Sequence, residues 1–161
     1  MFTRILVAVD GSMNSDAALD EALAMTRDQH AKLRIVHVID RRPRAIGPIL
    51  PDLEAFAAAA VEAGHRVTAS AQEAADAAGV DAEVVLAEIG RCPCPLSSKV
   101  LSEAADFAAG LIVIGAEERT GLRRRFSEGV EADVAHLAQV PVLVVHRQGH
   151  AWVARSVPLS A

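Results

Sequence analysis

Five short runs of apolar residues divide the chain, and none of them alternates strictly with polar positions. A continuous apolar run is typical of a strand that is covered on both faces, as in a parallel sheet. Polar and glycine-containing turns follow the runs, beginning with Asp10, Gly11 and Ser12 after the first run. We therefore predict strands over Arg4–Val9, Leu33–Ile39, Ala82–Ala87, Leu111–Ile114 and Val140–His146.

Between these runs, apolar residues recur every three or four positions, which is the spacing of amphipathic helices. The first helix is expected to begin at a cap formed by Asn14 or Ser15. The second runs from about residue 52 to Ala78, the third begins at residue 97 or 98, and a fourth follows the glycine-containing loop after Ile114. Gly64 lies inside the second helix and should weaken it by about 1 kcal/mol relative to Ala.

The alternation of five strands with four helices predicts one doubly wound parallel sheet, because parallel neighbours need crossover connections. A chain of 161 residues also has the length of one domain with a core of its own. We expect a single α/β domain over residues 1–147 and an irregular tail over residues 148–161. Apolar residues such as Trp152 and Val153 indicate that the tail packs against something.

Charge and cysteine content narrow the function classes. The formal charge is −5, from 16 basic and 21 acidic residues, which argues against a generic binder of nucleic acid or anionic lipid. No apolar run is long enough to span a membrane or to form the core of a secretory signal. Cys92 and Cys94 are too few and too close for a secreted disulfide framework. These features predict a cytoplasmic protein with no nucleic-acid or membrane partner.

Several stretches of the chain carry a family resemblance. They are ILVAVDGS from residue 5, IVHVID from residue 35, LIVIG from residue 111, RTGLRR from residue 119 and VPVLVVH from residue 140. Together they resemble the universal stress protein family over Ile5 to His146. The resemblance implies a role in the stress response and a flavodoxin-like, five-stranded sheet with strand order 3-2-1-4-5.

The resemblance also implies a homodimer in which the last strands of two subunits meet. The apolar run Val142–Val145 supports such a contact independently, since a strand at the edge of a sheet offers unpaired backbone groups to a partner. The alternative is that the tail of the same chain covers this edge.

One branch of this family binds ATP through a loop of Gly, two residues, Gly, nine residues, Gly and then Ser or Thr. Backbone amides can wrap a phosphate only where no side chain blocks the approach. Here Gly115 matches the first position, but Glu118, Glu128 and Gly129 fall on the other three. A carboxylate about 5 Å from a phosphate charge is repelled by roughly 3 kcal/mol at an effective dielectric of 20, whereas a helix N-terminus stabilises it by about 0.3 to 2 kcal/mol. We therefore predict that ATP binding is lost or weak.

Nucleotide binding stays open as an alternative, because Gly129 can supply the third glycine if the loop holds one extra residue. Arginines of two loops also form either a basic rim for an anion or a solvated surface; they are Arg41, Arg42, Arg44, Arg119, Arg123, Arg124 and Arg125. Asp10 would contact ribose or hold magnesium through water, or else accept amide hydrogen bonds in its own turn. If ATP or AMP binds, the expected site residues are Asp10, Val38, Gly115, Gly121, Gly129 and Val130.

Other chemistry is weakly supported. Cys92 and Cys94 could take up a soft metal or form a redox couple, but two thiols without a nearby His do not make a closed zinc site. His37 is expected to be a hydrogen-bonded core histidine. We find no nucleophile elbow and no Walker-type loop, so no catalytic or metal-binding residue is predicted.

The leading interpretation is a non-catalytic, homodimeric universal stress protein that needs no cofactor and acts through contacts with an unidentified protein partner. The alternative is an adenine-nucleotide sensor or slow ATPase of the same family. A thiol or metal sensor that uses Cys92 and Cys94 is a third interpretation.

Overall fold

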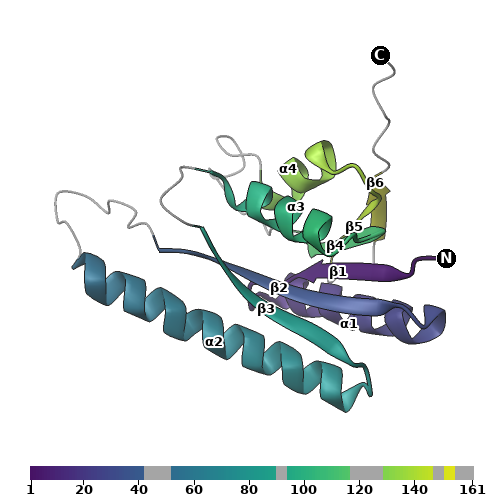
Figure 1. The fold of residues 1–161 in the computed structure, drawn as a ribbon, viewed down its shortest axis with the longest axis horizontal. Helices are drawn as coiled ribbons and strands as arrows, with labels where there is room; N and C mark the ends of the chain where they lie inside the picture. Colours follow the sequence, from purple (N-terminus) through teal and green to yellow (C-terminus); the bar gives the residue numbers. More distant parts are fainter. Residues whose placement is uncertain (42–51, 90–93, 117–128, 147–150, 155–161) are drawn as a thin grey trace.

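The computed structural model describes residues 1–41, 52–89, 94–116, 129–146 and 151–154 (Figure 1). Within these ranges, strands and helices alternate as far as the fifth strand, as the hydrophobic pattern predicts. The elements are, in chain order, β1 (Arg4–Ala8), α1 (Met13–Gln29), β2 (Lys32–Asp40), α2 (Leu53–Ala77), β3 (Ala82–Ile89), α3 (Leu96–Asp106), β4 (Leu111–Gly115), α4 (Val130–Leu137), β5 (Val142–Val145) and β6 (Ala151–Ala154).

The strands form one sheet in the order β3-β2-β1-β4-β5-β6. The first five strands are parallel, so the predicted order 3-2-1-4-5 and the doubly wound, flavodoxin-like arrangement are confirmed. None of the helices in the described ranges is long and apolar enough to cross a membrane.

The sixth strand corrects the expectation of an irregular tail. β6 runs antiparallel to β5, with Val153 opposite Leu143 and Ala154 opposite Val142. The outer edge of β5 offers unpaired backbone groups, and only five residues of sequence separate β5 from β6, which is short enough for an antiparallel neighbour. In this single chain the tail therefore occupies the edge at which a partner was expected.

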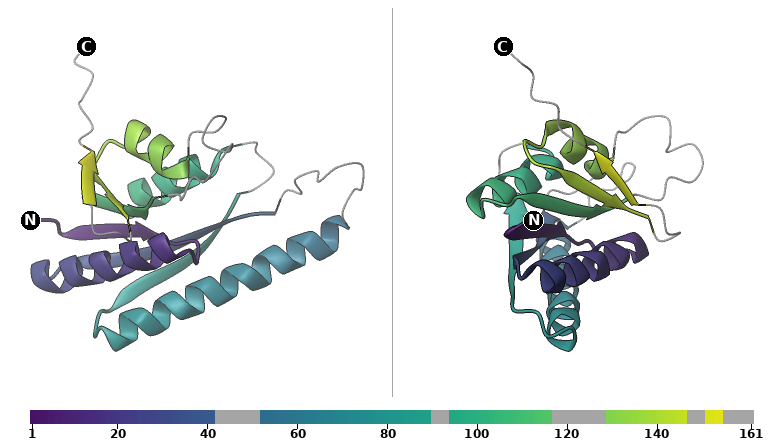
Figure 2. Two further views of the ribbon diagram at one scale, coloured as in Figure 1. Left: turned by 180° about the vertical axis from the view of Figure 1, so that it is seen from behind. Right: turned by 90° about the vertical axis from the view of Figure 1, so that its right-hand side faces the viewer.

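Helices cover both faces of the sheet, α1 and α2 on one face and α3 and α4 on the other (Figures 1 and 2). Each layer has its own core, and neighbouring residues of one strand enter different cores because successive side chains alternate across a strand. On β1, Val7 packs under α1 and α2, and Leu6 packs under α3 and α4. This two-sided burial explains why the strands are continuous apolar runs.

The start of α1 differs from the prediction that Asn14 or Ser15 caps the helix. The N-cap is Ser12, whose hydroxyl accepts a hydrogen bond from the Ser15 amide at 3.2 Å. The two expected caps are buried and have other partners. The Ser15 hydroxyl accepts from the Asp10 amide at 2.9 Å, and the Asn14 side-chain amide donates to the Ala116 carbonyl at 2.7 Å.

Gly64 lies where α2 passes closely over β2 and β3. A Cβ atom added at this position would lie 2.8 Å from Leu86 Cδ1 and 2.9 Å from Ile39 Cγ2. The absence of a side chain therefore allows the close approach of helix and sheet. This close packing offsets the cost of about 1 kcal/mol that glycine brings to the stability of the helix.

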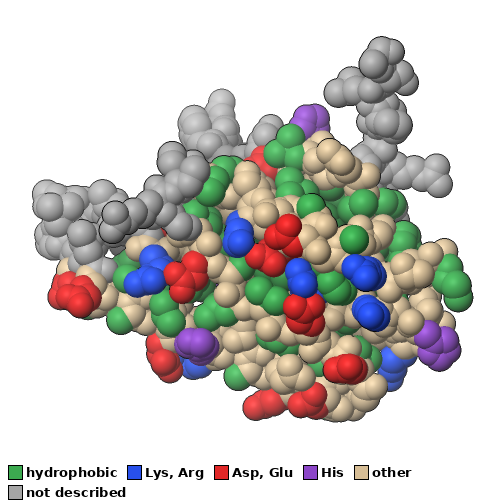
Figure 3. Space-filling view, viewed as in Figure 1, with side chains coloured by type: hydrophobic (Ala, Val, Ile, Leu, Met, Phe, Trp, Pro, Cys, Tyr) green, Lys and Arg blue, Asp and Glu red, His purple; other side chains and the backbone are tan. Residues whose placement is uncertain are grey.

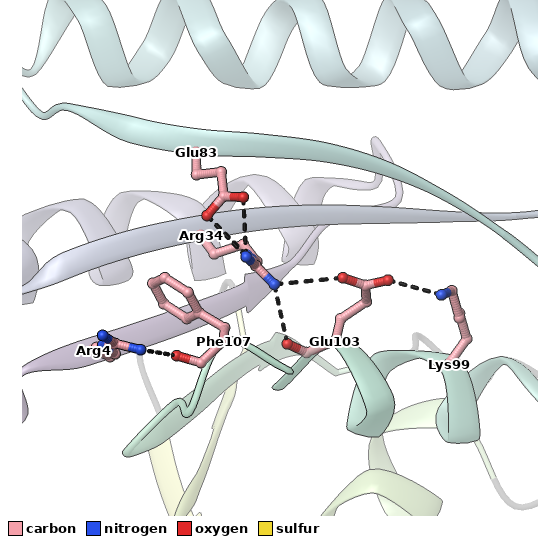
Figure 4. Close-up of polar contacts among 6 residues, drawn as sticks. All are labelled: Arg4, Arg34, Glu83, Lys99, Glu103 and Phe107. Carbon is pink, nitrogen blue, oxygen red and sulfur yellow. Dashed lines mark hydrogen bonds and ion pairs between the residues drawn. The ribbon is translucent and has the colours of Figure 1, made fainter. Parts of the chain in front are cut away.

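A charged network fastens α3 to the sheet (Figure 4). Arg34 of β2 lies between two carboxylates, with Nη2 2.9 Å from Glu83 Oε1 and Nη1 3.6 Å from Glu103 Oε2. Its guanidinium carbon is 4.6 Å from the centre of the Phe107 ring, a cation–π distance. Lys99 Nζ reaches the other oxygen of Glu103 at 2.8 Å. Acidic and basic side chains are interspersed over this face of the molecule, as Figure 3 shows.

The position of this network matters for the rest of α3. Arg34 and Phe107 hold the C-terminal end of the helix over β2. The N-terminal end of α3, which carries Leu96 and Val100, lies over the opposite, carboxyl end of the strands, where both side chains line a cavity.

Candidate functional site

The cavity lies at the carboxyl ends of β1, β2 and β4, on the side of the sheet covered by α3 and α4. The chain leaves β1 towards β2 on one side, whereas β4 pairs with β1 on the other, so this is the point at which the strand order reverses. Open α/β sheets bind ligands at such a point. The lining residues are Ala8, Val9, Asp10, Ser15, Val36, His37, Val38, Leu96, Val100, Ile114, Gly115 and Val130.

Four of the six expected site residues, Asp10, Val38, Gly115 and Val130, line this one cavity. Gly129 directly precedes Val130, as the N-cap of α4. The sixth residue, Gly121, lies outside the described residues, as do Glu118 and Glu128 and the arginines at positions 42, 44, 119 and 123–125. Arg41 is described and forms an ion pair with Glu88 at 3.1 Å.

Several lining residues were not singled out from the sequence. Val36 could have been predicted from Val38, because side chains alternate along a strand and these two lie on the same face. Leu96 and Val100 come from the first two turns of α3, and no local pattern distinguishes them from ordinary core residues.

Asp10 is exposed at the rim of the cavity and is held in a turn. Its Oδ1 accepts a hydrogen bond from the Ser12 amide at 2.9 Å, and its own amide donates to the Ser15 hydroxyl at 2.9 Å. Asp10 therefore has the structural role considered above, in which its carboxylate accepts an amide hydrogen bond within its own turn. A carboxylate has about four acceptor sites, so this turn leaves capacity for a ligand hydroxyl.

Gly115 is required by the packing of β4 against α1. A Cβ atom added here would lie 2.5 Å from the backbone carbon of Asn14 and 2.6 Å from the amide nitrogen of Ser15. No non-bonded carbon approaches backbone atoms so closely in a relaxed structure, so the fold itself demands glycine at this position. The match of Gly115 to the first position of the ATP loop therefore has a structural cause.

The N-terminus of α4 faces the cavity with little to offer an anion. Its N-cap, Gly129, leaves the first backbone amides uncapped, but the first turn carries the carboxylates of Glu131 and Asp133. Asp133 Oδ2 accepts a hydrogen bond from the buried Ser97 hydroxyl at 3.3 Å. Carboxylates in the first turn satisfy the positive end of the helix dipole, which weakens its attraction for a phosphate.

The expected hydrogen bond of His37 is present. Its Nδ1 lies 2.7 Å from the Val9 carbonyl oxygen, which ties β2 to the end of β1.

The two thiols add little evidence for a metal or redox site. Cys94 is half-buried and Cys92 lies outside the described residues. Within those residues, no three His, Cys, Asp or Glu side chains lie close enough together to hold a metal ion.

Comparison with known proteins agrees with this fold. The model of the universal stress protein family matches residues 1–146. The chain belongs to the universal stress protein family. A relative in Bacillus subtilis, the universal stress protein YxiE, is 30% identical over 152 residues, which cover 90% of this chain and 99% of YxiE.

Solved structures of universal stress proteins share the fold. One from Burkholderia pseudomallei is 30% identical, with a TM-score of 0.69, and the match covers 89% of this chain and 95% of that one. A universal stress protein in complex with cAMP is 23% identical, with a TM-score of 0.68 over 90% of this chain and 97% of the other. At this identity the second match speaks for the fold alone.

Proposed function

We propose that this chain is a non-catalytic universal stress protein whose cavity accepts the base and ribose of an adenine nucleotide but adds little for the phosphates. ATP then binds weakly or not at all, and the protein acts through contacts with other proteins. The observation that carries the proposal is the N-terminus of α4, where the carboxylates of Glu131 and Asp133 occupy the first turn.

The cavity supports the nucleoside half of this proposal. Its walls are mainly aliphatic, and the Asp10 carboxylate at the rim is suited to accept a ribose hydroxyl. Its volume of about 120 Å³ is below the roughly 300–1,000 Å³ of a typical small-molecule pocket, so it is sized for one part of a nucleotide. The family member solved with cAMP makes an adenine nucleotide the natural first ligand to test.

Electrostatics support the second part of the proposal, that the site adds little for the phosphates. At an effective dielectric of 20, a carboxylate about 5 Å from a phosphate charge costs roughly 3 kcal/mol. The helix dipole contributes at most about 2 kcal/mol in return. The first turn of α4 carries two carboxylates, Glu131 and Asp133, so each added phosphate is expected to gain little there.

The location of binding can be tested by NMR. On titration with adenosine, we expect shifts of the amide resonances of Ala8, Val38, Gly115 and Val130, which line the cavity. AMP is expected to shift the same resonances to a similar extent. Shifts confined to other parts of the chain, or no shift at millimolar adenosine, would contradict the nucleoside half of the proposal.

We further propose that homodimerisation uses the outer edge of β5, Val142–Val145, and competes with β6 for it. Both partners would pair with the same row of backbone groups. A chain that ends at His146 is therefore expected to dimerise about tenfold more tightly than the full chain in sedimentation analysis, since it loses the competitor. A chain that ends at Ala154 keeps β6 and is the control. Weaker dimerisation of the shorter chain would show that the tail itself forms the contact.

A further inference from the structure

β2 extends beyond the end of β1, and this leaves part of its backbone without a strand partner. In a parallel ladder, every second residue of a strand directs both its N–H and its C=O towards the same neighbour. The Val9 amide donates to the Val36 carbonyl at 2.9 Å, so Val36 faces β1. Val38 is two residues further along and faces the same side, where the pairing of β1 with β2 has ended at Ala8.

One more step of the ladder would join the Val38 amide to the Val9 carbonyl. Instead, this carbonyl lies 2.7 Å from Nδ1 of His37. Because a carbonyl oxygen can only accept, Nδ1 must be the nitrogen that carries the proton. Among the described residues, no backbone hydrogen bond joins the Val38 amide to Val9. The Val38 residue is only half-buried and lines the cavity.

We propose that His37 is a positioning residue that ends the β1–β2 ladder one step early and thereby keeps the Val38 N–H available to a ligand in the cavity. The imidazole satisfies the Val9 carbonyl in place of the Val38 amide. The freed N–H then donates to a ring nitrogen of a planar heteroaromatic base whose edge meets the end of β2. This inference rests on the proposed nucleoside site and assigns the residue that prepares it.

The packing around His37 holds the imidazole in this role. α2 passes over the ring at Gly64, where an added Cβ would lie 3.3 Å from His37 Cδ2. The ring is thus confined between α2 and the end of β1. A side chain of similar size without a donor would occupy the same space but leave the Val9 carbonyl unpaired. The Val38 amide is then its nearest available donor, because the ladder geometry already directs it there.

Amide hydrogen exchange of the ligand-free protein tests this arrangement directly. In the wild-type chain, the Val38 amide is expected to exchange at least about tenfold faster than that of Val36, which lies within the paired ladder. In His37→Leu, the Val38 amide should slow about tenfold, because the Val9 carbonyl becomes its acceptor. In His37→Gln, whose side-chain amide can still donate to Val9, it should stay fast. Equal protection of Val38 and Val36 in the wild-type chain would overturn the proposal, and this comparison holds even if a variant fails to fold.

Adenosine binding provides the second readout. His37→Leu is expected to weaken adenosine binding about tenfold, and His37→Gln to change it by less than about threefold. Equal binding by the wild-type chain and His37→Leu would overturn the role of His37 towards a ligand. If the wild-type chain binds no adenosine, the proposed nucleoside site fails, whereas the exchange data still decide whether His37 ends the ladder.

Discussion

Gly115→Ala is expected to lower the free energy of unfolding by about 3 kcal/mol, the upper part of the range for an overpacked core. The added Cβ would lie 2.5 to 2.6 Å from three backbone atoms of Asn14 and Ser15. Since these are backbone atoms, no side-chain rotation relieves the clash, and α1 must move away from β4. That movement also strains the buried hydrogen bond from Asn14 to the Ala116 carbonyl. Urea denaturation of both proteins measures the difference.

Gly110→Ala is the matched control for this prediction. Its Cβ would lie 3.7 Å from the nearest atoms, which is ordinary van der Waals contact, so the change in stability should stay within about 0.5 kcal/mol. If Gly115→Ala were as stable as Gly110→Ala, the close approach of β4 and α1 would be wrong. Gly115 would then have to be explained by a ligand instead of by the fold.

The double substitution Glu118→Gly and Glu128→Gly is expected to raise the affinity for ATP at least about tenfold, or roughly 1.4 kcal/mol. Both residues lie outside the described part of the chain, so this prediction rests on the loop pattern that begins at Gly115. Each substitution removes a carboxylate that costs roughly 3 kcal/mol at about 5 Å from a phosphate. Calorimetric titration of ATP with magnesium measures the gain.

The pair Glu118→Gln and Glu128→Gln separates charge from backbone freedom. The glutamines remove the negative charges but keep side chains that hinder a phosphate from reaching the backbone amides. We therefore expect the glutamine variant to gain less affinity than the glycine variant. No gain in either variant would show that the glutamates are not what weakens ATP binding.

Sequence patterning was sufficient for the sheet but not for its last strand. The runs that became β1 and β4 are buried on both faces, so apolar residues are required at almost every position. β6 lies at the edge of the sheet. Its formation depends more on backbone pairing with β5 than on the residues of β6 itself. An edge strand after a short connection therefore leaves little trace in the hydrophobic pattern.

For the candidate site too, the sequence predicts some features and not others. Asp10 and Val38 stand at strand ends, where topology alone brings them together, and both line the cavity. The contribution of His37 depends on the end of a ladder between two strands, which no local pattern reveals. The structural demand for Gly115 arises from α1, about a hundred residues earlier in the chain, and could not be distinguished from a phosphate-binding glycine by sequence.

The ratio of the dissociation constants of adenosine and of ATP with magnesium, measured by calorimetry on the wild-type chain, tests the central claim most directly. The two ligands share the base and ribose and differ only in the phosphates, so the ratio isolates what the α4 terminus and the preceding loop contribute. We predict that ATP binds no more than about tenfold more tightly than adenosine, a difference of at most roughly 1.4 kcal/mol. Micromolar ATP binding that is about a hundredfold or more tighter than adenosine would contradict the claim and favour an ATP-binding sensor.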